Sequence, residues 1–183
     1  VGEPLAIRVH AERYAAHPRG AQVDLVTEVS AADGRVWEGR STYLSKGAPA
    51  PPGDPEPVSR AEPEPVDVPV PVAVWQVAPG VGRRYAAVSG DVNPIHLHPL
   101  AARAFGFPRT IAHGMWTAAR ALAAIHGRLA SVDAFTYDVA FGKPLLLPST
   151  VELRTRSVLG GWNLDVRSAK SGAVHLRASV RSS

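Results

Sequence analysis

Two groups of three short segments, one near each end of the chain, alternate apolar and polar side chains. Successive side chains of a β-strand point to opposite faces of a sheet, so this alternation predicts strands with one apolar face. The predicted strands of the first group span 5–14, 22–30 and 35–44, and those of the second span 151–158, 162–168 and 174–180. Short turns that contain glycine separate the strands within each group.

The spacing of the turn glycines indicates that the two groups are copies of one layout. Gly34 and Gly172 lie 138 residues apart, and Gly20 and Gly160 lie 140 residues apart. Self-similarity at a fixed spacing is the sequence signature of a repeat. We therefore predict an internal repeat, one of pattern rather than of residue identity.

A helix is predicted ahead of the second group only. Between residues 113 and 130, apolar side chains recur at spacings of three and four, which gives a helix a single apolar stripe. The stripe consists of Met115, Ala118, Leu122, Ile125 and Leu129. Nothing comparable precedes Leu5, so the first group of strands would leave one apolar face bare.

This bare face leads to two alternative expectations. Either the native protein continues upstream of Val1, which is not a methionine, or a partner chain covers the face. A complete protein with two copies would have roughly 280–300 residues, about twice the size of an ordinary domain.

Residues 47–72 separate the two groups. They hold nine of the seventeen prolines, and proline fixes φ and lacks a backbone donor, so this stretch cannot join a helix or a central strand. We predict a semi-rigid, extended linker. On either side we expect an amino-terminal part, 1–46, and a carboxy-terminal domain, 73–183.

The 183 residues have an ordinary globular composition, 45% hydrophobic and 20% charged, which excludes wholesale disorder. No apolar run approaches the roughly 18 residues that span a bilayer, and no signal-peptide pattern opens the chain. Cysteine is absent, which excludes disulfides, thiolate metal sites and cysteine nucleophiles. These features predict a cytoplasmic protein without a membrane span.

The formal net charge of +4 is unevenly distributed. Residues 47–72 hold five acids and one arginine, a sum of −4, so the rest of the chain sums to +8. This balance favours either an anionic partner, such as a phosphate-bearing small molecule, or a merely solvated basic surface. Nucleic acid is not expected, because the chain has no run of Lys or Arg, no zinc-ligand spacing and no interleaving of aromatic and basic residues.

The densest cluster of reactive side chains lies between residues 85 and 98. Asp91 and Asn93 precede Pro94, an arrangement typical of a turn that could bring Asp91 and His96 to one small pocket. A carboxylate and an imidazole within reach of one water form an acid/base couple, since histidine titrates near pH 6.5. Two alternatives remain open here: a structural turn with a surface histidine, and a metal site of Asp91, His96 and His98.

Gly114 stands where the predicted helix opens. The first N–H groups of a helix lack partners within the helix, and the helix dipole favours negative charge at that end. Because glycine leaves room for a close approach to the backbone, Gly114 is a candidate oxyanion donor. The alternative is a glycine that merely starts the helix.

Three motifs together carry a resemblance to a known family. They are YxxxSGDxNPxH at 85–96, AHGM at 112–115 and FGKPLLLPSTV at 141–151. The chain from 73 to 183 resembles the MaoC-like (R)-specific enoyl-thioester hydratases and 3-hydroxyacyl-thioester dehydratases. That resemblance implies an α+β hot-dog fold, an antiparallel sheet wrapped around a central helix. Segment 1–46 is then similar to the closing strands of another hot-dog half, as in a double hot-dog whose first half is incomplete in this chain.

The resemblance also implies an activity, the reversible dehydration of (R)-3-hydroxyacyl thioesters in fatty-acid metabolism, with no metal and no cofactor. Asp91 and His96 would hold the water or hydroxyl between them, and the Gly114 N–H would stabilise the thioester oxygen. Of these two acid/base groups we favour His96 at carbon 2 and Asp91 at the hydroxyl. Asn93 would orient Asp91 or the turn, while Ser89 and Gly90 would shape the approach.

The substrate would be an acyl group on coenzyme A or on an acyl carrier protein. Basic residues near the motifs are candidates for its phosphates: Arg83, Arg84, Arg109 and Lys143. Apolar residues of the predicted helix are candidates for lining the acyl chain: Met115, Trp116 and Leu122. The expected partner is a second copy or another hot-dog chain.

Two other functions compete with this hypothesis. One is a non-catalytic hot-dog subunit that completes or scaffolds a partner dehydratase, which the incomplete first half motivates. The other is a thioesterase on the same fold, which fits the layout of Asp91, Asn93 and His96 less well.

Overall fold

The computed structural model describes residues 2–49, 51–53, 63–67, 70–129 and 134–182. The chain falls into two compact units, Val1–Arg60 and Ala61–Ser183, and each is described by itself. The predicted linker spans this division, and its residues 50, 54–62 and 68–69 lie outside the described residues.

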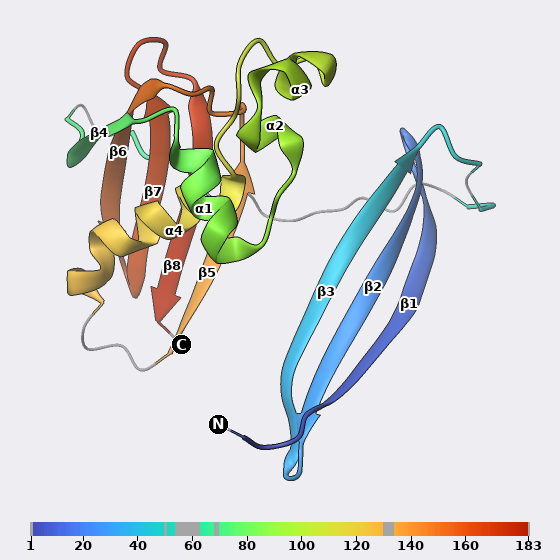
Figure 1. Ribbon diagram of the computed structural model, residues 1–183. Helices are drawn as coiled ribbons and strands as arrows, with labels where there is room; N and C mark the ends of the chain where they lie inside the picture. Colours follow the sequence, from blue (N-terminus) through green and yellow to red (C-terminus); the bar gives the residue numbers. More distant parts are fainter. Residues whose placement is uncertain (1, 50, 54–62, 68–69, 130–133, 183) are drawn as a thin grey trace. The chain divides into compact units, whose positions relative to one another are not determined.

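The first unit is a three-stranded antiparallel sheet in the order β1–β2–β3 (Figure 1). Its strands are β1 (Ala6–His17), β2 (Gly20–Ala31) and β3 (Gly34–Lys46). All three predicted strands are confirmed, each slightly longer than its alternating pattern. The register aligns Ile7, Val29 and Trp37 across the sheet, so one face is apolar. On that face the exposed fractions of Ile7 and Trp37 are 68% and 53%.

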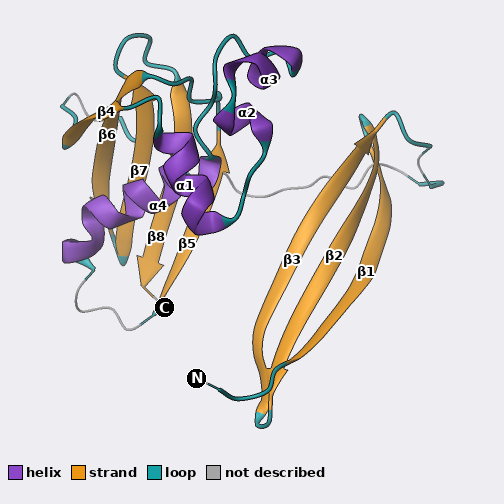
Figure 2. Cartoon of the chain, viewed as in Figure 1, coloured by secondary structure: helices purple, strands orange, loops and turns teal. Residues whose placement is uncertain are grey.

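The second unit is a five-stranded antiparallel sheet in the order β4–β6–β7–β8–β5. Its strands are β4 (Ala73–Val77), β5 (Phe135–Phe141), β6 (Ser149–Val158), β7 (Gly161–Ser168) and β8 (Val174–Ser182). The three strands predicted here, now β6, β7 and β8, are confirmed. Figure 2 shows the helices of this unit gathered over the sheet.

The helices lie between β4 and β5 in the sequence. They are α1 (Val81–Ser89), α2 (Pro94–Leu97), α3 (Pro99–Ala104) and α4 (Gly114–Ile125), followed by a short 3₁₀ turn, His126–Arg128. Helix α4 is the predicted central helix, and it contacts β7 and β8 (Figure 1). Among the helices that the structure describes, none is long and apolar enough to cross a membrane.

Most of the predicted stripe is buried: Ala118, Ile125 and Leu129 belong to the core, and Leu122 packs against it. Ala118 and Ala121 are fully buried against the sheet, where their small side chains let the helix approach closely, and Ile125 is 1% exposed. Met115 was predicted in the stripe but is 60% exposed. It lies in the first turn of α4, ahead of the part that the core covers. The predicted helix also extended further, to 130, whereas α4 ends at Ile125.

Part of the predicted linker packs against the second unit. Val66 is fully buried, and its carbonyl accepts a hydrogen bond of 2.9 Å from the guanidinium of Arg167. Val72 donates its N–H to the carbonyl of Leu153 at 2.9 Å. These described parts of the segment are irregular, without helix, as a chain rich in proline requires.

Candidate active site

The turn between α1 and α2 is built by side chains that bond their own backbone. Gly90 ends α1 with a φ of 74°, in the left-handed region that suits glycine. The Ser89 hydroxyl donates to the Tyr85 carbonyl at 2.9 Å and accepts the Asp91 N–H at 3.2 Å. The sequence Ser-Gly-Asp therefore fixes the direction in which the chain leaves α1.

Asn93 completes the turn in two ways. Its backbone N–H donates to Oδ1 of Asp91 at 3.1 Å, and its own side-chain oxygen accepts the Ile95 N–H at 3.3 Å, which caps α2. Pro94 takes the first position of that helix, where no donor is needed. Both contacts are consistent with the expectation that Asn93 orients Asp91 or the turn.

His96 comes from α2 and is 9% exposed. Its Nδ1 lies 2.9 Å from the carbonyl of Ile111, and because a carbonyl only accepts, Nδ1 carries the proton and Nε2 is left unprotonated. The pKa of His96 is lowered, first by burial and then by neighbouring His113, while the bond to Ile111 and the charge of Asp91 oppose the change. The His96 ring is therefore neutral near neutral pH, and its Nε2 is free to accept a proton.

Gly114 is the first residue of α4. Among the hydrogen bonds of the described residues, none is donated by its N–H. A side chain at this position would crowd the site, because an added Cβ would lie 3.0 Å from the ring of Phe141.

These groups converge on one pocket of about 380 Å³. The pocket is lined by Tyr85, Ser89, Asp91, His96, His113, Gly114, Met115 and Phe141. The structure thus brings together Asp91, His96 and Gly114, the three residues that the sequence nominated for chemistry. The carboxylate of Asp91 is 53% exposed, so it faces solvent at the pocket while His96 lies deeper.

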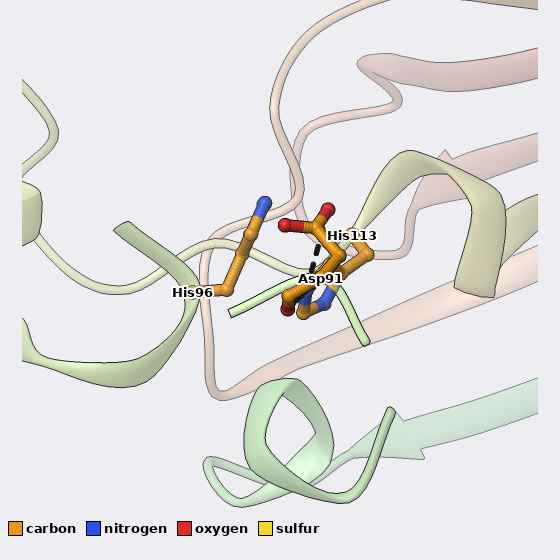
Figure 3. Close-up of side chains that lie close together, drawn as sticks. All are labelled: Asp91, His96 and His113. Carbon is orange, nitrogen blue, oxygen red and sulfur yellow. Dashed lines mark hydrogen bonds and ion pairs between the residues drawn. The ribbon is translucent and has the colours of Figure 1, made fainter. Parts of the chain in front are cut away.

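His113 is the residue of this pocket that sequence reasoning missed. It is 2% exposed, its Nε2 lies 3.0 Å from the Asp91 carbonyl, and its ring stacks on His96 with centroids 3.7 Å apart. Figure 3 shows Asp91, His96 and His113 side by side, with the contact between Asp91 and His113 dashed. Its signal was present in the sequence, a histidine directly before the candidate oxyanion donor, but only the fold places it beside the other two.

The alternative of a metal site formed by Asp91, His96 and His98 is wrong about His98. His98 is exposed and stands at the junction of α2 and α3, whereas His113 takes the third place. Asp91, His96 and His113 offer atoms within 4.8 Å of one another. The two histidine rings, however, are stacked with an interplanar angle of 26°. Imidazole nitrogens bind a metal ion through lone pairs in the ring plane, and the planes of two stacked rings run nearly side by side rather than meeting at one point, which does not suit a shared cation.

The four candidate phosphate-binding residues lie in different surroundings. Arg83 donates to the Leu97 carbonyl at 3.3 Å and Arg109 to the Pro148 carbonyl at 3.2 Å, so both guanidinium groups hold backbone. Arg84 lines a separate pocket of about 270 Å³. Lys143 lines a pocket of about 180 Å³ that shares His96, Gly114 and Phe141 with the main one.

The three residues predicted to line the acyl chain also lie in different surroundings. Met115 lines the main pocket, and Trp116 lines the pocket of Arg84 together with Val88. Leu122 instead packs against the hydrophobic core, so its predicted place in a lining gives way to a structural one.

Comparisons with known proteins show the family to which the chain belongs. The family described as MaoC like domain matches residues 60–180. The chain is 45% identical over 181 residues to 3-hydroxyacyl-thioester dehydratase X of Mycobacterium tuberculosis, which covers 99% of this chain and 63% of that protein. The chain therefore spans less than two thirds of the length of this curated relative.

Solved structures show the same fold. The crystal structure of HtdX of Mycobacterium tuberculosis has a TM-score of 0.74 and 42% identity, over 99% of this chain and 68% of that one. A MaoC-like dehydratase from Phytophthora capsici has a TM-score of 0.70 at 21% identity, over 98% of this chain and 64% of that one. The expected hot-dog fold is confirmed, while the double hot-dog with an incomplete first half stays a prediction. On the match over residues 60–180 and the shared architecture, the chain belongs to the MaoC-like domain family.

Proposed function

We propose that this chain catalyses the dehydration of (R)-3-hydroxyacyl thioesters and the reverse hydration of 2-enoyl thioesters. The observation that carries the proposal is the convergence of Asp91, His96 and the Gly114 N–H on one pocket of about 380 Å³. The similarity to a relative named 3-hydroxyacyl-thioester dehydratase X supports it.

The acid/base pair accounts for the proton transfers. In dehydration the C2–H bond breaks, its electrons form the C2–C3 double bond, and hydroxide leaves carbon 3. His96, with Nε2 unprotonated, takes the proton from carbon 2, and Asp91 holds the leaving hydroxyl. The pair returns one proton to that hydroxyl, which departs as water, so enzyme and charge end unchanged. Positioned groups of this kind contribute about 10²–10⁴ in rate.

Gly114 supplies the remaining stabilisation. As the C2–H bond breaks, negative charge moves to the thioester oxygen, and an N–H at the start of α4 is oriented to receive it. One such donor contributes about 3–4 kcal/mol to the transition state. Because no metal or redox step is needed in this scheme, the prediction of a cofactor-free enzyme stands as part of the proposal.

The substrate is proposed to be an acyl group carried by coenzyme A or by an acyl carrier protein. Of the four basic candidates, Lys143 has the strongest support, because the pocket that it lines shares the residues His96 and Gly114 with the main pocket. Met115 and Trp116 are proposed to contact the acyl chain. A place in fatty-acid metabolism and in the cytoplasm follows from the substrate class and stays a prediction.

We further propose that another hot-dog element covers the apolar face of β1, β2 and β3. Large apolar side chains on this face, such as Ile7 and Trp37, are more than half exposed, and water-exposed apolar faces of this kind mark interaction sites. A homodimer or a heterodimer with another hot-dog chain would supply the cover. Light scattering coupled to size exclusion would show a single-chain mass if this proposal is wrong.

The direct test mixes the purified chain with a 2-enoyl-CoA and follows the loss of conjugated-enoyl absorbance. Turnover supports the enzyme, and inactivity both alone and with any co-purifying chain would leave the non-catalytic subunit as the function. Release of free thiol instead would indicate a thioesterase.

A further inference from the structure

His113 is tied to both members of the proposed acid/base pair, although nothing in the reaction requires a second histidine. It precedes α4 directly and points its ring away from the helix, between the turn at Asp91 and the ring of His96 (Figure 3). It is one of the most buried polar residues of its unit, with an exposed fraction of 2%. Burying an imidazole so completely costs free energy unless hydrogen bonds and packing contacts offset the loss of water.

The contact with Asp91 is made to the backbone. His113 Nε2 lies 3.0 Å from the Asp91 carbonyl oxygen, which can only accept, so Nε2 carries the proton and donates. Oδ2 of the same residue lies farther away, 3.7 Å from Nε2. The donor therefore anchors the peptide of Asp91 and leaves Oδ2 of its carboxylate to the pocket, while Oδ1 accepts the Asn93 N–H.

The contact with His96 is made through the ring face. The two rings stack with centroids 3.7 Å apart and an interplanar angle of 26°. The hydrogen bond from Nδ1 to Ile111 fixes the direction of the His96 ring within its plane, and the stack prevents the ring from turning out of that plane. Tyr85 also contacts the ring of His113, with centroids 5.0 Å apart.

We propose that His113 is a positioning residue, which holds the Asp91 peptide through Nε2–H and the His96 ring through its face, so that one side chain sets the distance between base and acid. The inference rests on the proposed function. His113 itself need not touch the substrate. A displacement of about 1 Å between reacting groups lowers rates by about 10², so the cost of losing both contacts is expected to appear in kcat rather than in KM.

Three substitutions separate the two contacts. His113→Ala removes both, and we expect kcat with a 2-enoyl-CoA to fall about 10- to 100-fold, with KM within about threefold. His113→Phe keeps a ring on His96 but loses the donor, and His113→Gln keeps a donor but loses the ring. Both should lie between Ala and the unsubstituted protein.

A pH profile gives a readout that a merely structural role would not move. The charge of His113 and the burial it provides both lower the pKa of His96, so losing them moves the acidic limb of kcat/KM to higher pH. The other titratable groups around His96 are Asp91 and Tyr85 in the main pocket and Lys143 and His175 in the smaller one. All four are unchanged in these variants.

Tyr137→Phe is the matched control. The Tyr137 hydroxyl donates to the Ala118 carbonyl of α4 at 2.9 Å, so this variant removes one hydrogen bond to the same helix without reaching the site. We expect its kcat within about twofold of the unsubstituted protein and its acidic limb unmoved. If His113→Ala behaves like Tyr137→Phe, the positioning role is wrong.

A second measurement works without turnover. In protein labelled with ¹⁵N-histidine, His96 should appear as the tautomer protonated at Nδ1. In His113→Ala the ring loses its stack and can turn away from the Ile111 carbonyl, so its two nitrogen signals should average. An inactive unsubstituted protein would overturn the proposed function, whereas an unchanged His96 tautomer in His113→Ala would overturn this inference alone.

Discussion

The two three-stranded groups share a layout but differ in what lies over their apolar faces. In the second unit, α4 covers β7 and β8, and Leu164, Val166 and Leu176 are fully buried. In the first unit the aligned positions of β1 and β3 carry Ile7 and Trp37, which are 68% and 53% exposed. The pattern of the strands is therefore enough to form a sheet, whereas a buried core forms only where a helix covers that sheet. The start of the same helix also lines the pocket.

The opposite faces of the two groups are alike. Each central strand places one fully buried aspartate there, Asp24 on β2 and Asp165 on β7. Asp24 accepts from Thr42 at 2.7 Å and pairs with Arg40 at 3.1 Å, and Asp165 pairs with Arg167 at 2.7 Å. Each group therefore buries one carboxylate that an arginine holds on the polar face of its central strand.

The largest effect is expected on turnover, from substitutions in the proposed active site of the second unit. Asp91→Asn and His96→Ala should each lower turnover of a 2-enoyl-CoA by at least about 100-fold, because each removes one member of the acid/base pair. Circular dichroism should show an intact fold. Asp33→Asn, in the exposed turn after β2, is the control and should leave turnover unchanged. Near-normal turnover in either site variant removes that residue from the mechanism.

The second-largest effect is expected on the free energy of unfolding, which should respond differently to substitutions in the two units. Leu164→Ala removes a fully buried side chain beneath α4 and should lower the free energy of unfolding by about 2–5 kcal/mol. Ile7→Ala removes an exposed one and should change it by less than about 0.5 kcal/mol. Urea denaturation of both variants measures the difference. Equal losses would mean that the face of β1, β2 and β3 is covered in solution.

The pH dependence of turnover belongs to the second unit. In the proposed mechanism His96 acts with Nε2 unprotonated, and its pKa is lowered chiefly by burial, so kcat/KM should stay level through the ordinary histidine range near pH 6.5. Below the lowered pKa the rate should fall about tenfold per pH unit. A profile that already bends at or above pH 6.5 would contradict a buried, unprotonated His96.

The pH dependence of stability in the acid range should be sharpest in the first unit. The Thr42 hydroxyl, with help from Arg40 and Arg13, lowers the pKa of Asp24 against the opposing effect of burial. A lowered folded-state pKa contributes stability that is present above the unfolded value, near 3.9, and is lost as the pH falls through the folded value. Thermal unfolding of Asp24→Asn should lack that acid-range loss, and an identical pH dependence in both proteins would speak against it.

The smallest expected effect is none at all. A chelator should leave turnover unchanged, because the stacked rings of His96 and His113 do not suit a shared cation. Activity that a chelator abolishes and zinc restores would make Asp91, His96 and His113 a metal site after all.

The sequence by itself determined the local elements and most of the chemistry. Alternation at every second residue gave both groups of strands, because a pleated backbone has only that period. The residues from Ser89 to Pro94 built their own turn through side-chain bonds to neighbouring backbone, which is local and therefore readable. Gly114 was likewise marked by its place at a helix start.

Only the tertiary structure decided which residues meet. His113 lies 22 residues after Asp91 and 17 after His96, and a stack of two rings across such distances follows from how α4 and α2 pack rather than from spacing. The ends of the buried face of α4 were decided in the same way, by how far the sheet covers the helix, so Met115 of the predicted stripe opens to the pocket while Ala121, outside the stripe, is buried. Packing selects among faces that periodicity leaves equivalent, and this is why the pattern named the helix but not the third residue of its site.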